Sequence, residues 1–203
     1  MAERGFGHPR TMLPVRGNRL TRMLGRLVLA LGGWRIAGKP PQVAKLVCIV
    51  APHTSNWDFV IGIAAVFALG LDVRWLGKHT LFRGPAGPLM RWLGGIPVDR
   101  SAPHGYSVEL SRLFRRSERL LLGIAPEGTR SRVERWRSGF YAIATAAEVP
   151  IVLCYLDYSE KVAGFGPVVI PSGDPQRDME HIGAFYRGVH AKRPDRFSPV
   201  VRI

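Results

Sequence analysis

Apolar and polar positions along the chain follow two different periods. Short continuous apolar runs rich in β-branched residues are typical of buried strands, whereas apolar residues three and four apart indicate helices. The first pattern predicts strands at residues 46–51, 73–76, 96–98, 120–125 and 149–156, with a weaker one at 168–170. The second predicts helices at residues 18–34, 57–68, 106–119, 139–148 and 179–190.

Strands that alternate with helices in this way predict an α/β fold with a mostly parallel central sheet flanked by helices. The chain has 203 residues, 46% of them hydrophobic, which is enough for one domain with a sizeable core and too little for a second full domain. We place this domain at residues 40–203.

The N-terminal region has a different pattern. Residues 1–16 are rich in Gly, Pro and Arg and lack apolar periodicity, which predicts a flexible basic arm. Residues 17–36 predict a basic amphipathic helix, because arginines lie mostly off an apolar stripe formed by Leu20, Met23, Leu24, Leu27, Val28 and Leu31. Such a helix either packs on the domain core or lies in a membrane surface, since both environments need the same pattern.

The charge of the chain limits the classes of binding partner that we expect. Lys and Arg number 29 against 15 Asp and Glu, a formal net charge of +14, so we expect attraction to polyanions. The sequence has no recognisable nucleic-acid motif, which favours an anionic membrane surface or a phosphorylated substrate over nucleic acid. The longest apolar run, residues 60–71, is shorter than the roughly 20 residues that cross a bilayer, and the N-terminus does not resemble a secretory signal. We therefore expect a cytoplasmic protein, peripheral on the inner face of the membrane.

The two cysteines, Cys48 and Cys154, are far apart in the sequence, and each lies inside an apolar run. We expect buried, inert thiols in preference to a disulfide or a metal site, as in a protein made for a reducing compartment. The sequence has no zinc-ligand spacing, so we expect no metal ion.

The first motif with chemical potential is His53 followed by Asp58, where a predicted strand gives way to a helix. Ligands of open α/β sheets bind beyond the carboxyl ends of the strands. A carboxylate in the first helical turn can contact an imidazole in the preceding loop, fix its tautomer and leave its other nitrogen to accept a hydroxyl proton. Two alternatives stay open: an ordinary loop histidine beside a helix-dipole carboxylate, or Ser55 as a nucleophile with His53 as its base.

Two further polar motifs follow predicted strands. In residues 125–131, Gly128 allows a close backbone approach, Thr129 offers a hydroxyl, and the Arg130 guanidinium matches phosphate oxygens. Glu127 is difficult to explain as a simple turn residue among so many cations. Residues 94–100 combine two glycines with Arg100, which would be a second phosphate contact. For both motifs the alternative is a charged surface turn.

The order and spacing of these motifs resemble the glycerolipid acyltransferase family, which includes lysophosphatidic acid and glycerol-3-phosphate acyltransferases. The resemblance covers residues 47–153 and consists of His-x4-Asp, Gly-Gly-x4-Arg, Glu-Gly-Thr-Arg-Ser and Val-Pro-Ile. The chain departs from the usual family pattern in the Thr-Ser-Asn-Trp filling of the first motif and in Val152 and Leu153 after the last, which indicates a divergent subgroup.

The resemblance implies that His53 is a general base with Asp58 as its partner, and that the acceptor hydroxyl attacks an acyl thioester directly. It also implies an acceptor site, which we extend to Thr129, made of Arg100, Glu127, Gly128, Thr129 and Arg130. The fourth motif implies an acyl-donor region, to which we add Lys78 because of its position, made of Val149, Pro150, Ile151 and Lys78.

The leading hypothesis is an O-acyltransferase that moves a fatty acyl group from acyl-CoA or acyl-carrier protein to a lysophospholipid hydroxyl, as in 1-acyl-glycerol-3-phosphate, during phospholipid biosynthesis. The acyl donor is then a co-substrate, and we expect no cofactor. Within this class, a transacylase or an acyltransferase for a non-glycerolipid acceptor is the alternative. From another class comes a non-catalytic basic membrane-binding protein.

Overall fold

The computed structural model describes residues 12–99, 105–198 and 203. Its strands are β1 (Arg35–Ala37), β2 (Lys45–Ala51), β3 (Val73–Lys78), β4 (Gly95–Val98), β5 (Leu120–Ile124), β6 (Ile151–Asp157) and β7 (Val162–Val169). Its helices are α1 (Arg19–Leu31), α2 (Asn56–Leu69), α3 (Gly87–Trp92), α4 (Gly105–Arg116), α5 (Gly139–Ala147) and α6 (Pro175–Tyr186), with short 3-10 turns η1 (His79–Phe82) and η2 (Pro194–Arg196).

The strands form a seven-stranded sheet in the order β1-β7-β6-β2-β5-β3-β4. Neighbouring strands are parallel except β6 and β7, which are antiparallel. The predicted α/β fold with a mostly parallel sheet is therefore confirmed. The carboxyl ends of β2, β3, β5 and β6 lie at one edge of the sheet, where ligands of such folds bind.

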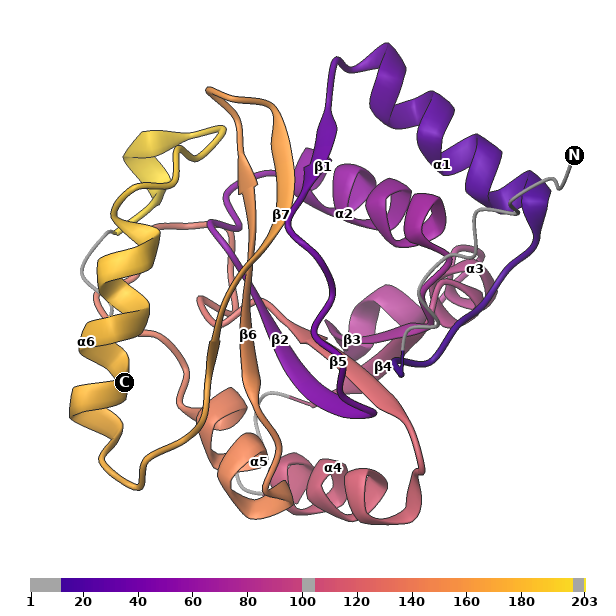
Figure 1. The fold of residues 1–203 in the computed structure, drawn as a ribbon. Helices are drawn as coiled ribbons and strands as arrows, with labels where there is room; N and C mark the ends of the chain where they lie inside the picture. Colours follow the sequence, from indigo (N-terminus) through magenta and orange to yellow (C-terminus); the bar gives the residue numbers. More distant parts are fainter. Residues whose placement is uncertain (1–11, 100–104, 199–202) are drawn as a thin grey trace, which may run out of the picture.

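Helices cover both faces of this sheet (Figure 1). Alternate residues of β2 point to opposite faces. Val47, Ile49 and Ala51 join the main core cluster with α4, α5 and α6, whereas Leu46 and Cys48 belong to a cluster on the other face. The second face is covered by α2, and α1 packs against α2 as an outer layer (Figure 1).

The α1 helix begins at Asn18, whose side chain accepts a hydrogen bond from Thr21 N at 3.0 Å. It packs on α2 through Gly25 and Leu29, which are buried. The large apolar side chains on its other side are exposed. We call them the α1 apolar face; they are Leu20, Met23, Leu24, Leu27 and Leu31.

Two expectations for the N-terminal region need correction. The helix is shorter than residues 17–36, because it ends at its C-cap Gly32 and Gly33 has a positive φ. Residues 35–37 instead form β1, which pairs with β7. Residues 12–16, predicted to be part of a flexible arm, lie against the body of the domain. Leu13 is fully buried, and Arg16 N donates to Gly70 O at 2.9 Å. Residues 1–11 of that arm lie outside the described residues.

The third part of the chain that differs from expectation is β7. We predicted a weak strand at residues 168–170, whereas β7 spans Val162–Val169 and forms an antiparallel hairpin with β6. Gly164 and Gly166 lower the strand propensity of this segment, which explains the weak signal. A short helix, α3, also forms in a segment rich in Gly and Pro. Among the helices of the described residues, none is long and apolar enough to cross a bilayer.

The packing of α1 on α2 gives a stability prediction. A Cβ atom at Gly25 would lie 2.5 Å from both Ala64 O and Ala68 N, so any side chain there pushes the two helices apart. We expect Gly25→Ala to lower the free energy of unfolding in urea, although the same change in an unobstructed helix raises it by about 1 kcal/mol. Gly62→Ala is the matched control, because a Cβ there meets no atom within 4 Å. Equal stabilisation by both substitutions would contradict this packing.

Candidate active site

The loops that follow β2 and β5 meet because these two strands are parallel neighbours in the sheet. His53 lies two residues after β2 ends, and Glu127 lies three residues after β5 ends. Glu127 Oε2 accepts a hydrogen bond of 2.8 Å from the backbone N of His53. Two residues 74 positions apart in the sequence are thereby fixed to each other.

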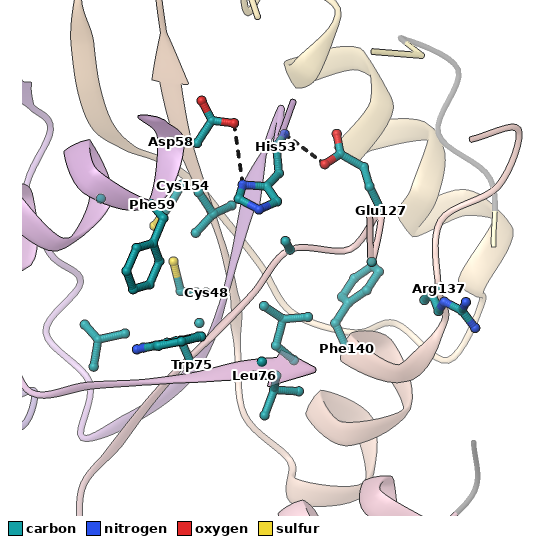
Figure 2. Close-up of a pocket in the computed structure, with 18 of the residues that line it drawn as sticks. Cys48, His53, Asp58, Phe59, Trp75, Leu76, Glu127, Arg137, Phe140 and Cys154 are labelled. Atoms are coloured by element: carbon teal, nitrogen blue, oxygen red, sulfur yellow. Dashed lines mark hydrogen bonds and ion pairs between the residues drawn. The ribbon is translucent and has the colours of Figure 1, made fainter. Parts of the chain in front are cut away.

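The His53–Asp58 spacing follows from how α2 begins. Ser55 is the N-cap, and Asp58 is the third helical residue, whose side chain reaches back over the helix N-terminus. Asp58 Oδ2 accepts hydrogen bonds of 2.7 Å from the backbone N of Thr54 and of Ser55. The same oxygen lies 3.5 Å from His53 Nδ1. Figure 2 shows Asp58 and Glu127 on opposite sides of His53.

This arrangement fits a general base. Because Nδ1 faces the carboxylate, Nε2 is the ring nitrogen that would accept a proton. The 3.5 Å separation is longer than a hydrogen bond, and such contacts commonly shorten when a substrate binds. Asp58 is almost fully buried, so its carboxylate is both the cap of α2 and the partner of His53. The Ser55 Oγ accepts from Trp57 N at 3.2 Å, which is a capping role.

Tyr158 is a site residue that the sequence interpretation missed. Its hydroxyl donates a 2.7 Å hydrogen bond to Asp58 Oδ1. Tyr158 comes directly after β6, which lies next to β2, so it reaches the same edge of the sheet. The sequence signal was its place two residues beyond the predicted strand at residues 149–156, but no pattern connects it with a residue 100 positions away.

Glu127 has an unusual environment. Its carboxyl is buried, and Oε1 has no hydrogen-bond partner. Burial raises the pKa of Glu127 to about 8; the hydrogen bond from His53 N acts in the opposite direction, and the charge of Asp58 adds to the rise. At neutral pH most molecules therefore carry Glu127 as a neutral acid.

The rest of the Glu-Gly-Thr-Arg-Ser motif surrounds a tight turn. Gly128 has φ of +68°, a conformation that favours glycine, and a Cβ there would lie 3.1 Å from Arg137 Nε. Arg137 is held in place by its backbone N, which donates to Pro126 O at 2.8 Å. Thr129 and Arg130 are exposed. Thr129 Oγ1 accepts a hydrogen bond from the backbone N of Ser131.

A cavity of about 1230 Å³ opens beside His53. It is larger than a typical site for a small ligand, for which roughly 300–1,000 Å³ is usual. Its apolar part lies between α2 and the sheet and is lined by Phe59, Ile63, Val66, Cys48, Val50, Trp75 and Cys154 (Figure 2). Exposed cationic residues also line it, namely Lys78, Arg130, Arg135 and Arg137. The lining of the site therefore combines a large apolar surface with cationic side chains.

Most of the predicted site residues come together at this cavity. His53, Asp58, Lys78 and the motif from Glu127 to Arg130 all line it. Arg100 lies outside the described residues. The structure places the predicted donor residues elsewhere: Val149, Pro150 and Ile151 lie before or at the start of β6, at the opposite end of that strand from the cavity, and do not line it. Val149 and Ile151 are core residues, so we do not include this segment in the site.

Cys48 and Cys154 are free thiols on the adjacent strands β2 and β6. Both line the apolar part of the cavity, so they belong to its wall. A hydrogen bond with Cys48, together with burial, raises the pKa of the Cys154 thiol, which keeps it protonated. No group of three or more His, Cys, Asp or Glu side chains within the described residues is placed to hold a metal ion.

The fold and the site together define an acyltransferase. The family model described as Acyltransferase matches residues 38–157, which is more than half of the chain and includes His53, Asp58 and the Glu-Gly-Thr-Arg-Ser motif. The chain belongs to this family, which confirms its resemblance to the glycerolipid acyltransferases.

Comparison with solved structures gives a relative with the same fold. The crystal structure of PlsC from Thermotoga maritima, a 1-acyl-sn-glycerophosphate (LPA) acyltransferase, superposes with a TM-score of 0.59 and 14% sequence identity. The match covers 82% of this chain and 75% of PlsC. No curated protein sequence matches the chain.

The environment of Glu127 predicts a pH-dependent stability difference. Its pKa is raised from 4.5 to about 8 in the folded protein, so the fold holds this proton more tightly than the unfolded chain does. The resulting stabilisation is full below pH 4.5 and is lost as pH rises through 8. We expect Glu127→Gln to gain stability relative to the wild type over this range, by on the order of a few kcal/mol. Urea unfolding at about pH 5, 7 and 9 measures this difference in the free energy of unfolding.

Glu134→Gln is the control for this experiment, because Glu134 is exposed. Its stability should follow that of the wild type at each pH. If the free energy of unfolding of Glu127→Gln also changes with pH as that of the wild type does, the Glu127 carboxyl does not retain its proton on folding.

Proposed function

We propose that the protein transfers a fatty acyl group from an acyl thioester, acyl-CoA or acyl-carrier protein, to the hydroxyl of a lysophospholipid such as 1-acyl-glycerol-3-phosphate, in phospholipid biosynthesis. One observation carries this proposal. The His53–Asp58 pair lines a large cavity that is walled by both apolar and cationic side chains. An amphiphile with an anionic headgroup matches both parts.

The proposed reaction uses His53 as the base. Its Nε2 takes the proton of the acceptor hydroxyl while the oxygen attacks the thioester carbonyl carbon. The carbon–sulfur bond breaks, an ester forms, and the imidazolium returns the proton to the leaving thiolate. Asp58 fixes the tautomer and stabilises the imidazolium. No acyl-enzyme is needed, which agrees with the capping role of the Ser55 hydroxyl.

Cationic residues support a phosphorylated acceptor. Arg130 presents a planar guanidinium at the cavity, and Lys78 and Arg137 add positive charge to its lining. Glu127 is neutral in most molecules at neutral pH, so it does not repel a phosphate. PlsC, which shares this fold, is an LPA acyltransferase, in agreement with an acceptor of this chemical class.

The apolar part of the cavity supports a long-chain substrate. A cavity of about 1230 Å³ exceeds what a small polar substrate fills. Its space arises in part from glycine, because a Cβ added at Gly62 of α2 would meet no atom within 4 Å. A non-catalytic basic protein would have no need of an apolar cavity beside a His–Asp pair.

We also propose that the protein docks on the anionic inner face of the membrane through α1. The α1 apolar face is exposed, and Arg19 and Arg26 of the same helix are exposed as well. Trp92, half exposed on α3, lies near the start of α1, where Arg16 stacks on its ring at 5.3 Å. Exposed apolar side chains flanked by arginines suit an interface of lipid chains and anionic headgroups.

The reaction is tested with purified protein, labelled acyl-CoA and lysophosphatidic acid. We expect acyl transfer, and a fall in kcat of about 100- to 10,000-fold in His53→Ala, the usual contribution of a general base. His190→Ala is the matched control, since His190 also contacts a carboxylate, Asp157, at 3.3 Å but does not line the cavity. A monoacylglycerol, which lacks the phosphate, should be the poorer acceptor.

Three results would count against the proposed reaction. They are no transfer from acyl-CoA or acyl-carrier protein, equal transfer by His53→Ala, and loss of transfer in Ser55→Ala together with an acyl ester trapped on Ser55 of the wild type. A preference for monoacylglycerol would move the acceptor outside the phosphorylated class.

Membrane docking is tested by sedimentation with vesicles of phosphatidylglycerol and phosphatidylcholine. We expect the double variant Leu24→Asn, Leu27→Asn to bind at least about tenfold more weakly than the wild type, because two apolar side chains lose their burial in lipid. The matched control replaces Val168 and Ile170, exposed apolar residues at the end of β7, in the same way. Equal weakening by both double variants would mean that α1 is not the docking helix.

A further inference from the structure

We propose that Tyr158 is a positioning residue for the acyl transfer: its hydroxyl holds the second oxygen of Asp58 so that the carboxylate keeps His53 aligned. This inference rests on the proposed function. Tyr158 lies one residue beyond the segment that the family model matches. It does not line the cavity, so it acts through Asp58 and not on the substrate.

The contacts of Asp58 divide between its two oxygens. Oδ2 accepts from Thr54 N and Ser55 N and faces His53 Nδ1. Oδ1 accepts a 2.7 Å hydrogen bond from the Tyr158 hydroxyl. A carboxylate tied at one oxygen can still turn about its last side-chain torsion, which has a broad energy minimum. The bond from Tyr158 fixes that torsion.

The orientation of the Asp58 carboxylate determines its interaction with His53, because the two groups lie slightly beyond hydrogen-bond distance. Nδ1 is 3.5 Å from Oδ2, so a small rotation of the carboxylate decides whether a good hydrogen bond can form. Hydrogen bonds between a charged and a neutral group weaken steeply with misalignment. Tyr158 therefore sets how well Asp58 supports the imidazolium during proton transfer.

Tyr158 is itself held from two sides. Its ring meets that of Trp34 edge to face, with centroids 4.8 Å apart. The ammonium of Lys192 lies 5.3 Å from the Tyr158 ring and 5.4 Å from the ring of Trp57, at the start of α2. Burial and the adjacent Asp58 carboxylate raise the pKa of the Tyr158 hydroxyl, so it remains a donor. The hydroxyl is thus a rigidly placed and permanently protonated group.

The variant Tyr158→Phe removes the hydroxyl and keeps the ring contacts with Trp34 and Lys192. We expect kcat for acyl transfer to fall about 10- to 100-fold, the loss that follows when one hydrogen bond to a charged group is removed. KM should stay within about twofold, because the variant changes no residue that lines the cavity. On an Asp58→Asn background, Tyr158→Phe should cause no further loss, since both act through one carboxylate.

Tyr141→Phe is the matched control. The Tyr141 hydroxyl also donates a 2.7 Å hydrogen bond to a buried carboxylate, that of Asp178, which does not line the cavity. The same atom is lost in both variants, so a general effect of removing a buried hydroxyl appears in both. Only Tyr158→Phe should lower kcat.

A measurement without substrate separates this inference from the proposed reaction. The Nδ1 proton of His53, followed by NMR, should exchange with solvent faster in Tyr158→Phe than in the wild type and at the wild-type rate in Tyr141→Phe. Wild-type protein that transfers no acyl group rejects the proposed function. Active protein in which Tyr158→Phe keeps its kcat and its His53 proton exchange, or in which the losses from Tyr158→Phe and Asp58→Asn multiply, overturns the role of Tyr158.

Discussion

The site is organised around one buried carboxylate. Asp58 accepts hydrogen bonds from Thr54 N, Ser55 N and the Tyr158 hydroxyl and lies beside the His53 ring. The same carboxylate therefore caps α2 and orients the His53 ring. A histidine two residues before the N-cap and a carboxylate at the third helical position are brought together by ordinary helix capping, which gives the His-x4-Asp spacing a physical origin.

The order of strands in the sheet brings the other site residues close to Asp58. Because β2 has β5 on one side and β6 on the other, the loops after these three strands share one edge. They deliver His53, Glu127 and Tyr158 to it. The same topology leaves α2 between α1 and an apolar cavity, which explains why α2 is apolar on more than one side. A motif dispersed over a hundred residues is thus a local structure in space.

Much of this could be predicted from the sequence, and the exceptions have physical causes. Strand β2 and helix α2 have strong local patterns, and His53, Asp58 and Glu127 were identified by the ordered motifs that resemble the glycerolipid acyltransferases. Tyr158 had none, because its role depends on a contact between residues 100 positions apart. Residues Val149 to Ile151 matched a motif, yet they lie at the other end of β6 from the cavity, and only the direction of that strand reveals it. Burial of Leu13 depends likewise on tertiary packing.

The neutral state of Glu127 affects the charge balance of the site. Two carboxyl groups flank His53, but burial keeps the Glu127 proton up to a pH of about 8. Near neutrality Glu127 thus adds little negative charge to a cavity lined by the cations Lys78, Arg130, Arg135 and Arg137. The charge of this lining therefore favours anionic ligands, as does the chain's net charge of +14. In more alkaline solution Glu127 ionises, and the field that attracts anionic ligands weakens at the point where they would bind.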